Sequence, residues 1–397
     1  KKYSGYITVA PNTYYFYWFF ESRRDPVNDP VTVFISGGPG CTTVGYTTAG
    51  LGTCHLKSDN ETVVTELSWN NVSNLLLIDQ PTGAGFSYGG TRLTSTDAGA
   101  PLFYNALQGF LKKYPQYQKN DMRFEGQSYG GHFAPSYANY VVQRNLNLPA
   151  GNVHINLCTL AISNGLTRTT YQWYDMRISP CTYVQNGPLL SPADCKTLRE
   201  SIATCVTMNK KCEQTGTNAD CVAALSYCNV HIRTPSQKAR GNSNETIHNN
   251  GNVVEYYNRP EIQRALGVAP MKYVSCTSSI LGDYGTTGDY VRDYAKYVAN
   301  VLNHGVKVLN GLFTFPFPSW YGVHAWTEAL DFNGQADYRA QPLLPWHLDG
   351  VEVGQFKSGG NLTFIRVYEA GHGTFQDQPQ VAFSLFNTTL NCTNPPT

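Results

Sequence analysis

A serine and a histidine lie in the two segments of the sequence best suited to chemistry. Residues 126–130 read GQSYG and place Ser128 in the G-x-S-x-G pattern, in which a serine sits on a sharp turn between a strand and a helix. His372 follows the apolar run NLTFIRV, late in the chain. A serine that can pass its proton to a histidine is a nucleophile for acyl transfer. Each signal alone is weak, because such pentapeptides also occur in loops and most histidines are structural.

Ser128 needs a strand before it and a helix after it, and the sequence predicts both. Residues 122–128 are predicted as the strand, and residues 130–145 have helical spacing. Further strands are predicted at 3–9, 14–22, 31–38, 74–81, 155–165, 306–311 and 361–372, and a helix at 291–305. Strands separated by helical patterns, with the histidine after the serine, predict the α/β-hydrolase fold, with a mixed, mostly parallel sheet flanked by helices.

A polar, cysteine-rich stretch interrupts this pattern. Residues 166–254 are predicted to be a cap inserted into a core formed by 1–165 and 255–397. The stretch holds six of the eleven cysteines, Cys181, Cys195, Cys205, Cys212, Cys221 and Cys228. The six cysteines show no paired C-x-x-C spacing, and no histidine lies among them, so the stretch lacks the pattern of a zinc site. Disulfides formed in an oxidising compartment are therefore favoured over a metal site or reduced thiols.

Composition excludes several classes of partner. The formal net charge is +1 and no block of like charges stands out, so no nucleic-acid surface is predicted. No apolar run is long enough to span a membrane. Six N-x-[ST] sequons suggest N-linked glycans and, with the cysteines, a secreted or vacuolar protein of the secretory pathway. Lys1 is not preceded by a signal peptide, which suggests a processed or trimmed chain. Oligomeric state is not predicted.

Several longer motifs resemble one family, the secreted serine carboxypeptidases of the fungal type. The matching segments, spread over nearly the whole chain in the family's order, are SGGPG at 36–40, IDQPTGAGFSY at 78–88, GQSYGGHFAP at 126–135, SNGL at 163–166, YYNRPEIQRALGV at 256–268 and AGHGTFQDQP at 370–379. This resemblance implies a secreted hydrolase that acts without a cofactor or a bound metal. It also implies that Cys276 pairs with Cys41 or Cys54, and that the six cysteines of the cap pair among themselves.

The resemblance also assigns roles. Ser128 would be the nucleophile and His372 the general base. The backbone N–H groups of Gly38 and Tyr129 would form the oxyanion hole, and Gly37 would line the substrate pocket, because backbone that approaches a substrate closely leaves no room for a Cβ. His132, after the elbow glycines, is interpreted as structural.

The sequence departs from the family at the residue that orients the histidine. Family members carry an aspartate in a G-D-x-D segment after the strand that reads VKVLNG here. Residues 294–327 contain no Asp or Glu, and Leu312, Phe313, Thr314 or Phe315 take the place of the acid. Replacing this acid by an amide lowers turnover about 10⁴-fold in the serine-protease example. Thr314, Ser319 or a backbone carbonyl remain as alternatives for orienting the ring.

Three further departures concern one task, the recognition of a peptide's C-terminal carboxylate. The family uses an Asn before the GGPG glycines, a Glu before the L-G-P stretch and an acid before the nucleophile. Ser36, Gly50 and Gln127 occupy these positions here. In addition, Gly373 and Phe375 replace a larger residue and a proline beside His372, on the leaving-group side. We therefore expect a weak peptidase or none.

The leading hypothesis is an enzyme on this scaffold that acts on a neutral, ring-bearing small molecule. Its pocket would include Thr314 and the aromatic residues Phe313, Phe315, Phe317, Trp320 and Tyr321. Its chemistry would be acyl transfer through Ser128, or acid–base or template catalysis of a cyclisation, elimination or condensation, in which no acyl-enzyme forms. One alternative is a carboxypeptidase with an unconventional triad that uses Glu369 or Asp377. Another is a catalytically inactive protein that binds a ligand in the old cleft.

Overall fold

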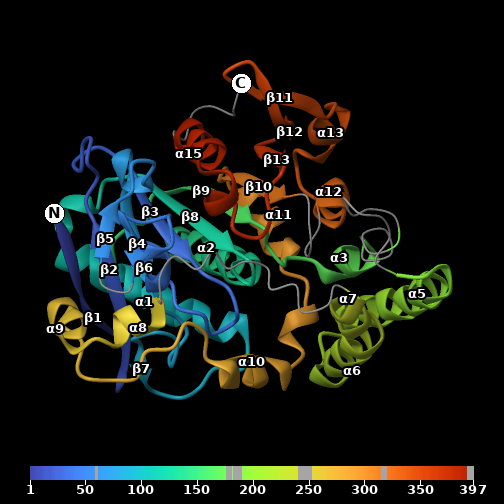
Figure 1. The fold of residues 1–397 in the computed structure, drawn as a ribbon, viewed down its shortest axis with the longest axis horizontal. Helices are drawn as coiled ribbons and strands as arrows, with labels where there is room; N and C mark the ends of the chain where they lie inside the picture. The colour runs from blue at the N-terminus through green and yellow to red at the C-terminus, as the bar shows by residue number, and fades with distance from the viewer. Residues whose placement is uncertain (59–60, 176–180, 182–189, 240–252, 314–319, 391–397) are drawn as a thin grey trace.

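The predicted α/β-hydrolase architecture is confirmed. The computed structural model describes residues 1–58, 61–175, 181, 190–239, 253–313 and 320–390, and within them an 11-stranded sheet is flanked by helices (Figure 1). The strands run in the spatial order β1 (Lys2–Ala10), β2 (Thr13–Phe20), β6 (Asn74–Ile78), β3 (Val31–Ile35), β8 (Met122–Gln127), β9 (Leu157–Ser163), β10 (Lys307–Phe313), β13 (Leu362–Val367), β12 (Val351–Gly359) and β11 (Leu344–Leu348), with β7 (Tyr88–Gly89) paired to β2. The central strands from β6 to β13 pair in parallel, and the outer strands are antiparallel.

The central strands are apolar because helices cover both of their faces. Every residue of β3, β6 and β8 is buried, as expected of parallel strands in the middle of a sheet. One face packs against α1 (Thr96–Lys113), α2 (Gly130–Leu146), α11 (Ala295–Asn303) and α12 (Trp320–Glu328). The other face packs against α9 (Pro260–Leu266) and α15 (Pro379–Thr388). Successive residues of β2 alternate between these two cores.

The predicted elements are recovered with small shifts of their ends. The predicted strand at 122–128 ends one residue earlier, and the predicted helix at 130–145 is α2. The predicted helix at 291–305 begins later, because residues 289–291 form a short 3-10 helix, η5 (Asp289–Val291). β11 and β12 lie outside every predicted range. β11 is the edge strand and β12 is its neighbour, and most of their residues are exposed or half-buried, so their sequences lack the continuous apolar run that revealed the central strands.

The segment between β9 and β10 adds no strand to the sheet among its described residues. It contains α3 (Thr169–Asp175), α5 (Pro192–Thr215), α6 (Asn218–Cys228), a π-helical turn η4 (Asn229–Arg233) and α7 (Thr234–Ala239), with α5 to α7 grouped at one end of the molecule (Figure 1). Ser191 and Thr217 cap the N-termini of α5 and α6, and Gly216, with a φ of +63°, separates the two helices.

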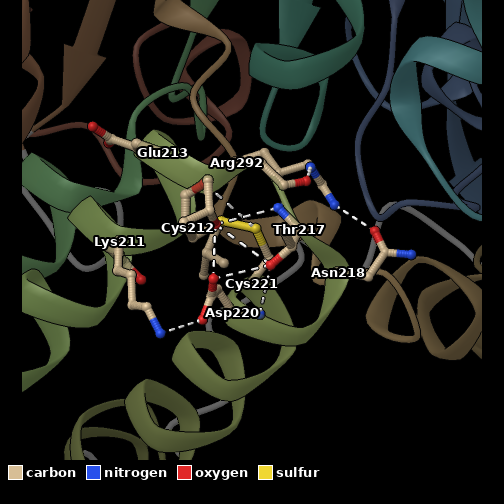
Figure 2. Close-up of a disulfide and its surroundings, with 12 residues drawn as sticks. Lys211, Cys212, Glu213, Thr217, Asn218, Asp220, Cys221 and Arg292 are labelled. Carbon is tan, nitrogen blue, oxygen red and sulfur yellow. Dashed lines mark hydrogen bonds and ion pairs between the residues drawn. A yellow bond between two sulfur atoms is a disulfide. The ribbon is translucent and has the colours of Figure 1, made fainter.

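Disulfides hold this helical segment together, as predicted. Cys181 pairs with Cys195, Cys205 with Cys228, and Cys212 with Cys221. Figure 2 shows the bridge between Cys212 and Cys221, beside which Arg292 donates to the side-chain oxygen of Asn218. Arg292 follows η5, so this contact joins the α5–α6 hairpin to the core.

The remaining cysteines and helices complete the description. Cys41 pairs with Cys276, the first of the two partners predicted for Cys276, and Cys54 is a free thiol. The helices not yet named are α8 (Val253–Asn258), α10 (Ser278–Gly285), α13 (Gln335–Ala340), α14 (Thr374–Asp377), η1 (Val44–Thr48), η2 (Trp69–Asn71) and η3 (Pro115–Tyr117), and a separate hairpin pairs β4 (Cys54–Ser58) with β5 (Glu61–Val64). In the described part of the chain, every helix is too short or too polar to cross a bilayer.

The close packing of α2 against β8 predicts the effect of a single methyl group. A Cβ at Gly126 would lie 2.4 Å from the carbonyl oxygen of Gly130, so Gly126→Ala should push the helix away and lower the free energy of unfolding by about 1–3 kcal/mol. Denaturant unfolding measures this. The control is Gly282→Ala on α10, where nothing lies within 4 Å and helix propensity predicts a gain of up to about 1 kcal/mol. Equal stability of the two variants would contradict the close approach.

Candidate active site

Ser128 lies on a strained turn between β8 and α2. Its φ is +61°, in the left-handed region that few residues other than glycine adopt, and its carbonyl accepts from the N–H groups of Gly131 and Leu166. A Cβ at Gly130 would lie 2.5 Å from the carbonyl oxygen of Ile35, and one at Gly37 would lie 2.6 Å from the nitrogen of Tyr129. Glycine is therefore required at both positions for the turn to approach β3 and the loop after it.

Two backbone N–H groups beside Ser128 have no acceptor. Neither the N–H of Gly38 nor that of Tyr129 donates a hydrogen bond to any described residue. Gly38, with a φ of +115°, lies in the loop after β3, and Tyr129 is the first residue after the nucleophile. Unpaired N–H groups from these two places can stabilise an oxygen that becomes negative when Ser128 attacks a carbonyl carbon. The oxyanion hole predicted at Gly38 and Tyr129 is compatible with this geometry.

A buried aspartate, Asp79, anchors the loop that carries Gly38. Its carboxylate accepts from the hydroxyl of Thr42 at 2.7 Å and from the N–H groups of Thr43 (2.7 Å), Val44 (3.1 Å) and Phe86 (2.9 Å). Burial raises the pKa of Asp79, and these donors oppose the shift by stabilising the carboxylate. The sequence analysis quoted this residue within the IDQP motif but gave it no role.

A second buried aspartate, Asp289 in η5, anchors Tyr129. The Tyr129 hydroxyl donates to the Asp289 carboxylate at 2.5 Å, and the Tyr294 hydroxyl donates to its other oxygen at 2.7 Å. Thr96 donates to the same carboxylate through its N–H and its hydroxyl. Burial raises the pKa of Tyr129 well above its ordinary value, so the phenol remains a donor. Asp289 therefore fixes the side chain of a residue whose backbone faces the reaction.

His372 lies on the loop between β13 and α14, where two side-chain amides hold its backbone. Asn164 donates to the carbonyl oxygens of Gly371 (3.2 Å) and His372 (2.9 Å), and Gln127 donates to the carbonyl oxygen of His372 at 2.9 Å. Asn164 follows β9 with a φ of +49°, a conformation that asparagine tolerates better than most residues. The sequence analysis missed its role, although an Asn-Gly pair directly after a strand was a usable signal.

A cavity of about 600 Å³, hereafter the active-site cavity, joins most of the predicted residues. Gly37, Gly38, Gln127, Ser128 and His372 line it, with Gly373 and Phe375 on the side of the histidine loop. The structure places three other predicted residues elsewhere. Ser36 and Tyr129 are buried and do not line this cavity, and Gly50 lines a neighbouring cavity. Of the aromatic residues expected in the pocket, Trp320 and Tyr321 belong to α12, which packs on the sheet, and neither lines the active-site cavity.

Four residues that were predicted to orient the ring of His372 or to line the substrate pocket lie outside the described residues, namely Thr314, Phe315, Phe317 and Ser319. Of the two residues named as alternatives, Glu369 is exposed, and its carboxylate makes no hydrogen bond or ion pair with a described residue, while its backbone carbonyl accepts from Gln378. Asp377 lines the active-site cavity and accepts from the N–H of Gly371 at 2.6 Å. His132 is fully buried and does not line the cavity, in keeping with a structural role, and burial lowers its pKa.

The described residues contain no group of three or more His, Cys, Asp or Glu side chains suited to a metal ion. The arrangement at Ser128 consists instead of a strained serine, a histidine in the same cavity and two unpaired N–H groups. Together these can perform nucleophilic attack on a carbonyl group.

Comparison with known proteins gives one family. The family model described as serine carboxypeptidase matches residues 1–392. The chain is 34% identical to a carboxypeptidase Y homolog A of Fusarium vanettenii, over 98% of this chain and 74% of that protein. It is 32% identical to a vacuolar serine-type carboxypeptidase of Saccharomyces cerevisiae, over 98% and 79%. The fold also matches a crystal structure of a prohormone-processing carboxypeptidase of Saccharomyces cerevisiae, with a TM-score of 0.83, 19% identity and coverage of 98% and 90%.

The amide of Asn164 offers a test of the histidine loop. Asn164→Asp keeps the side-chain shape and the tolerance of positive φ, but it sets a carboxylate against two carbonyl oxygens. We expect labelling of Ser128 by a fluorophosphonate to slow at least about tenfold, because the loop that carries His372 moves away. The matched control is Asn361→Asp, an exposed residue with a φ of +68° whose side chain makes no hydrogen bond to a described residue. Unchanged labelling in Asn164→Asp would contradict the anchor.

The Asp289 anchor gives a second test. Tyr129→Phe removes one phenol donor from Asp289 and frees the residue whose N–H is predicted to belong to the oxyanion hole. We expect slower fluorophosphonate labelling of Ser128, by several fold, and a loss of stability of about 1 kcal/mol. Tyr294→Phe removes the other phenol donor from the same carboxylate, so it should lower the stability similarly and leave labelling unchanged. Equal labelling rates in the two variants would rule out a specific role for the Tyr129 contact.

Proposed function

Because the chain belongs to the serine carboxypeptidase family, we propose that Ser128 attacks carbonyl groups, and that its substrates are neutral small-molecule esters or amides rather than peptides with a free C-terminal carboxylate. His372 takes the serine proton, and the N–H groups of Gly38 and Tyr129 stabilise the oxyanion. We infer weak peptidase activity or none. The proposed setting is the chemistry of a secondary metabolite.

One observation carries this proposal: none of the three positions that would read a carboxylate presents an acid or a cation to the cavity. The Ser36 hydroxyl donates to the carbonyl oxygen of Cys41 at 2.8 Å and is fully buried. The Gln127 amide donates to the carbonyl oxygen of His372, and Gly50 has no side chain. No Lys or Arg is among the described residues that line the active-site cavity. Since a charge-assisted hydrogen bond contributes about 1.5–3 kcal/mol, the lack of a charged partner weakens the binding of a carboxylate.

The remaining polar groups of the cavity favour a neutral substrate. Tyr46 and Ser275 line it, and neither hydroxyl donates to a described residue. Burial raises the pKa of Tyr46 to about 12, so its phenol stays neutral and can donate to an ester or ketone oxygen. Phe375, packed edge-on against Tyr46 with ring centroids 5.9 Å apart, adds an apolar surface for a ring.

The proposed reaction has two steps. The Ser128 oxygen forms a bond to the carbonyl carbon as its proton passes to His372, and the bond to the leaving oxygen or nitrogen breaks as that atom takes the proton. The acyl group is then on Ser128. Water, or the hydroxyl of a second small molecule, attacks the same carbon and gives its proton to His372, and Ser128 is released with the proton returned.

The second candidate is an ordinary carboxypeptidase with an unconventional triad. One observation favours it: Asp377 lies in the same cavity as His372 and is bonded to the adjacent Gly371. The third possibility is a protein that only binds a ligand in this cavity. Such a protein would not be labelled by a fluorophosphonate, whereas both enzymes would be.

We also propose a location and a role for the cap. A secreted or vacuolar protein would carry the disulfides described above, and two of the described glycan acceptors are exposed, Asn361 in the turn between β12 and β13 and Asn387 near the end of α15. Asn71 is less available, because its amide contacts Glu66 and Arg23. The proposed cap, residues 166–254, ends at the active-site cavity, where Val253 lines the wall, and it would control entry.

The test compares two blocked dipeptides that differ only at the last residue, one ending in a carboxylate and the other in a carboxamide, together with phenyl acetate. We expect phenyl acetate to be hydrolysed and the carboxylate dipeptide to be no better than the carboxamide in kcat/KM, because no Lys or Arg among the described lining residues can pair with the carboxylate. Ser128→Ala is the control and should abolish ester turnover. A preference for the carboxylate of about tenfold or more would establish the carboxypeptidase instead. If the protein shows neither turnover nor fluorophosphonate labelling, the result would favour a protein that only binds a ligand in this cavity.

A further inference from the structure

A second cavity of about 530 Å³, hereafter the outer cavity, adjoins the active-site cavity. Its walls include Gly50, His55, Glu66, Leu67 and Trp69. Ala49, Phe375 and Gln376 line both cavities, so the two spaces share a wall. None of the functions derived above uses the outer cavity.

Gly50 adds no side chain beside the wall that the two cavities share. A Cβ built at Gly50 would lie 3.8 Å from the Phe375 ring and 3.9 Å from the Gln376 side chain, which is ordinary contact distance. A side chain at this position would thus extend beside two residues shared by the cavities. Gly50 also has a φ of +102°, which other residues rarely adopt. The local backbone therefore keeps this space free.

The geometry points to the outer cavity as a binding site for the far end of the substrate's leaving group, and this inference rests on the proposed function. An enzyme that removes only the last residue of a chain needs a pocket that closes beyond that residue. Here the outer cavity adjoins the active-site cavity at Ala49, Phe375 and Gln376, and Gly50 lies beside them. In this inference a leaving group longer than one ring places its far end in the outer cavity.

The chemistry of the outer cavity selects a hydroxylated aromatic ring. Trp69 is held by a stacked Phe386, with ring centroids 4.1 Å apart, and by Phe375 edge-on at 6.5 Å, so its ring is preorganised for contact with another ring. The Trp69 indole N–H donates to no described residue. Glu66, on the rim, forms no ion pair with a described residue and can accept from a substrate hydroxyl.

Charge argues against an anionic leaving group. No Lys or Arg is among the described residues that line the outer cavity, so an anion would be repelled by Glu66 and would meet His55 as the one basic side chain among those lining residues. The guanidinium of nearby Arg23 donates to the carbonyl oxygens of Thr53 and Thr65 and to Asn71. A neutral phenolic ring satisfies both the apolar wall and the acceptor at the rim.

The test uses three acetate esters that differ in the length and the end of the leaving group: phenyl, 4-biphenylyl and 4′-hydroxy-4-biphenylyl acetate. Their phenols are of similar acidity, so differences report binding. We expect kcat/KM for the hydroxylated biphenyl ester to exceed that for phenyl acetate about tenfold or more, because the second ring is buried against Trp69. Glu66→Gln should reduce the hydroxylated ester to the level of the plain biphenyl ester and leave phenyl acetate unchanged.

A filling variant gives the decisive comparison. Leu67→Trp narrows the outer cavity, and we expect it to remove the advantage of both biphenyl esters while phenyl acetate turnover and fluorophosphonate labelling stay constant. Leu344→Trp, on the half-exposed edge strand β11, is the matched control and should change nothing. Biphenyl esters no better than phenyl acetate, or an equal loss for all three esters in Leu67→Trp, would overturn the inference.

Binding without turnover separates this inference from the proposed function. Calorimetric titration of Ser128→Ala with biphenyl-4,4′-diol should show binding that Leu67→Trp weakens about tenfold and Leu344→Trp does not. If no ester is hydrolysed but the diol binds in this pattern, the proposed function is wrong and the outer cavity is still supported as a binding site. If esters are hydrolysed but the diol does not bind, or binds equally to both tryptophan variants, the outer cavity is not a site.

Discussion

The close approach of three backbone segments around Ser128 is the constraint on which the rest of this structure depends. The elbow, the loop after β3 and the start of α2 come so near to one another that a Cβ at Gly37 or Gly130 would overlap backbone atoms. Only this approach brings the N–H of Gly38 near the N–H of Tyr129, beside the nucleophile. Hydrogen bonds from Gly131 and Leu166 to the Ser128 carbonyl hold the serine in a conformation it would not adopt alone.

Buried polar side chains hold this arrangement from outside the cavity. Asp79 binds the loop of Gly38, Asp289 binds Tyr129, and Asn164 binds the backbone of His372. Each comes from a different part of the sheet or its connections, and each accepts from or donates to backbone or phenol groups that would otherwise be buried without a partner. The catalytic groups therefore depend on a scaffold of positioning residues, and η5, which carries Asp289, is itself attached to the disulfide-bonded α5–α6 hairpin through Arg292 (Figure 2).

The same scaffold permits a change of substrate without a change of fold. Ser36 and Gly50 lie outside the strands, and Gln127 ends β8 and lines the active-site cavity, so these side chains can differ from the family pattern while the elbow remains intact. Their places are distinct: Ser36 turns its hydroxyl into its own loop, Gln127 braces the histidine loop, and Gly50 lines the outer cavity. A site that recognises a charged chain end needs convergent donors, and a site for an extended neutral molecule needs room and apolar walls.

The sequence alone determined the fold class, the central strands, the elbow and the pairing of the cap cysteines among themselves. These features depend on apolar runs, on glycines that only one backbone geometry requires, and on motifs that are local in the chain. Only the tertiary structure decided that Asn164 holds His372, that Asp289 holds Tyr129, and that Gly50 belongs to a different cavity from Ser128. It also supplied β11 and β12, the last two strands at one side of the sheet, whose partly exposed residues form no continuous apolar run. The physical reason is that these contacts join residues up to about two hundred positions apart, and their hydrogen bonds leave no periodic or local pattern from which a partner could be inferred.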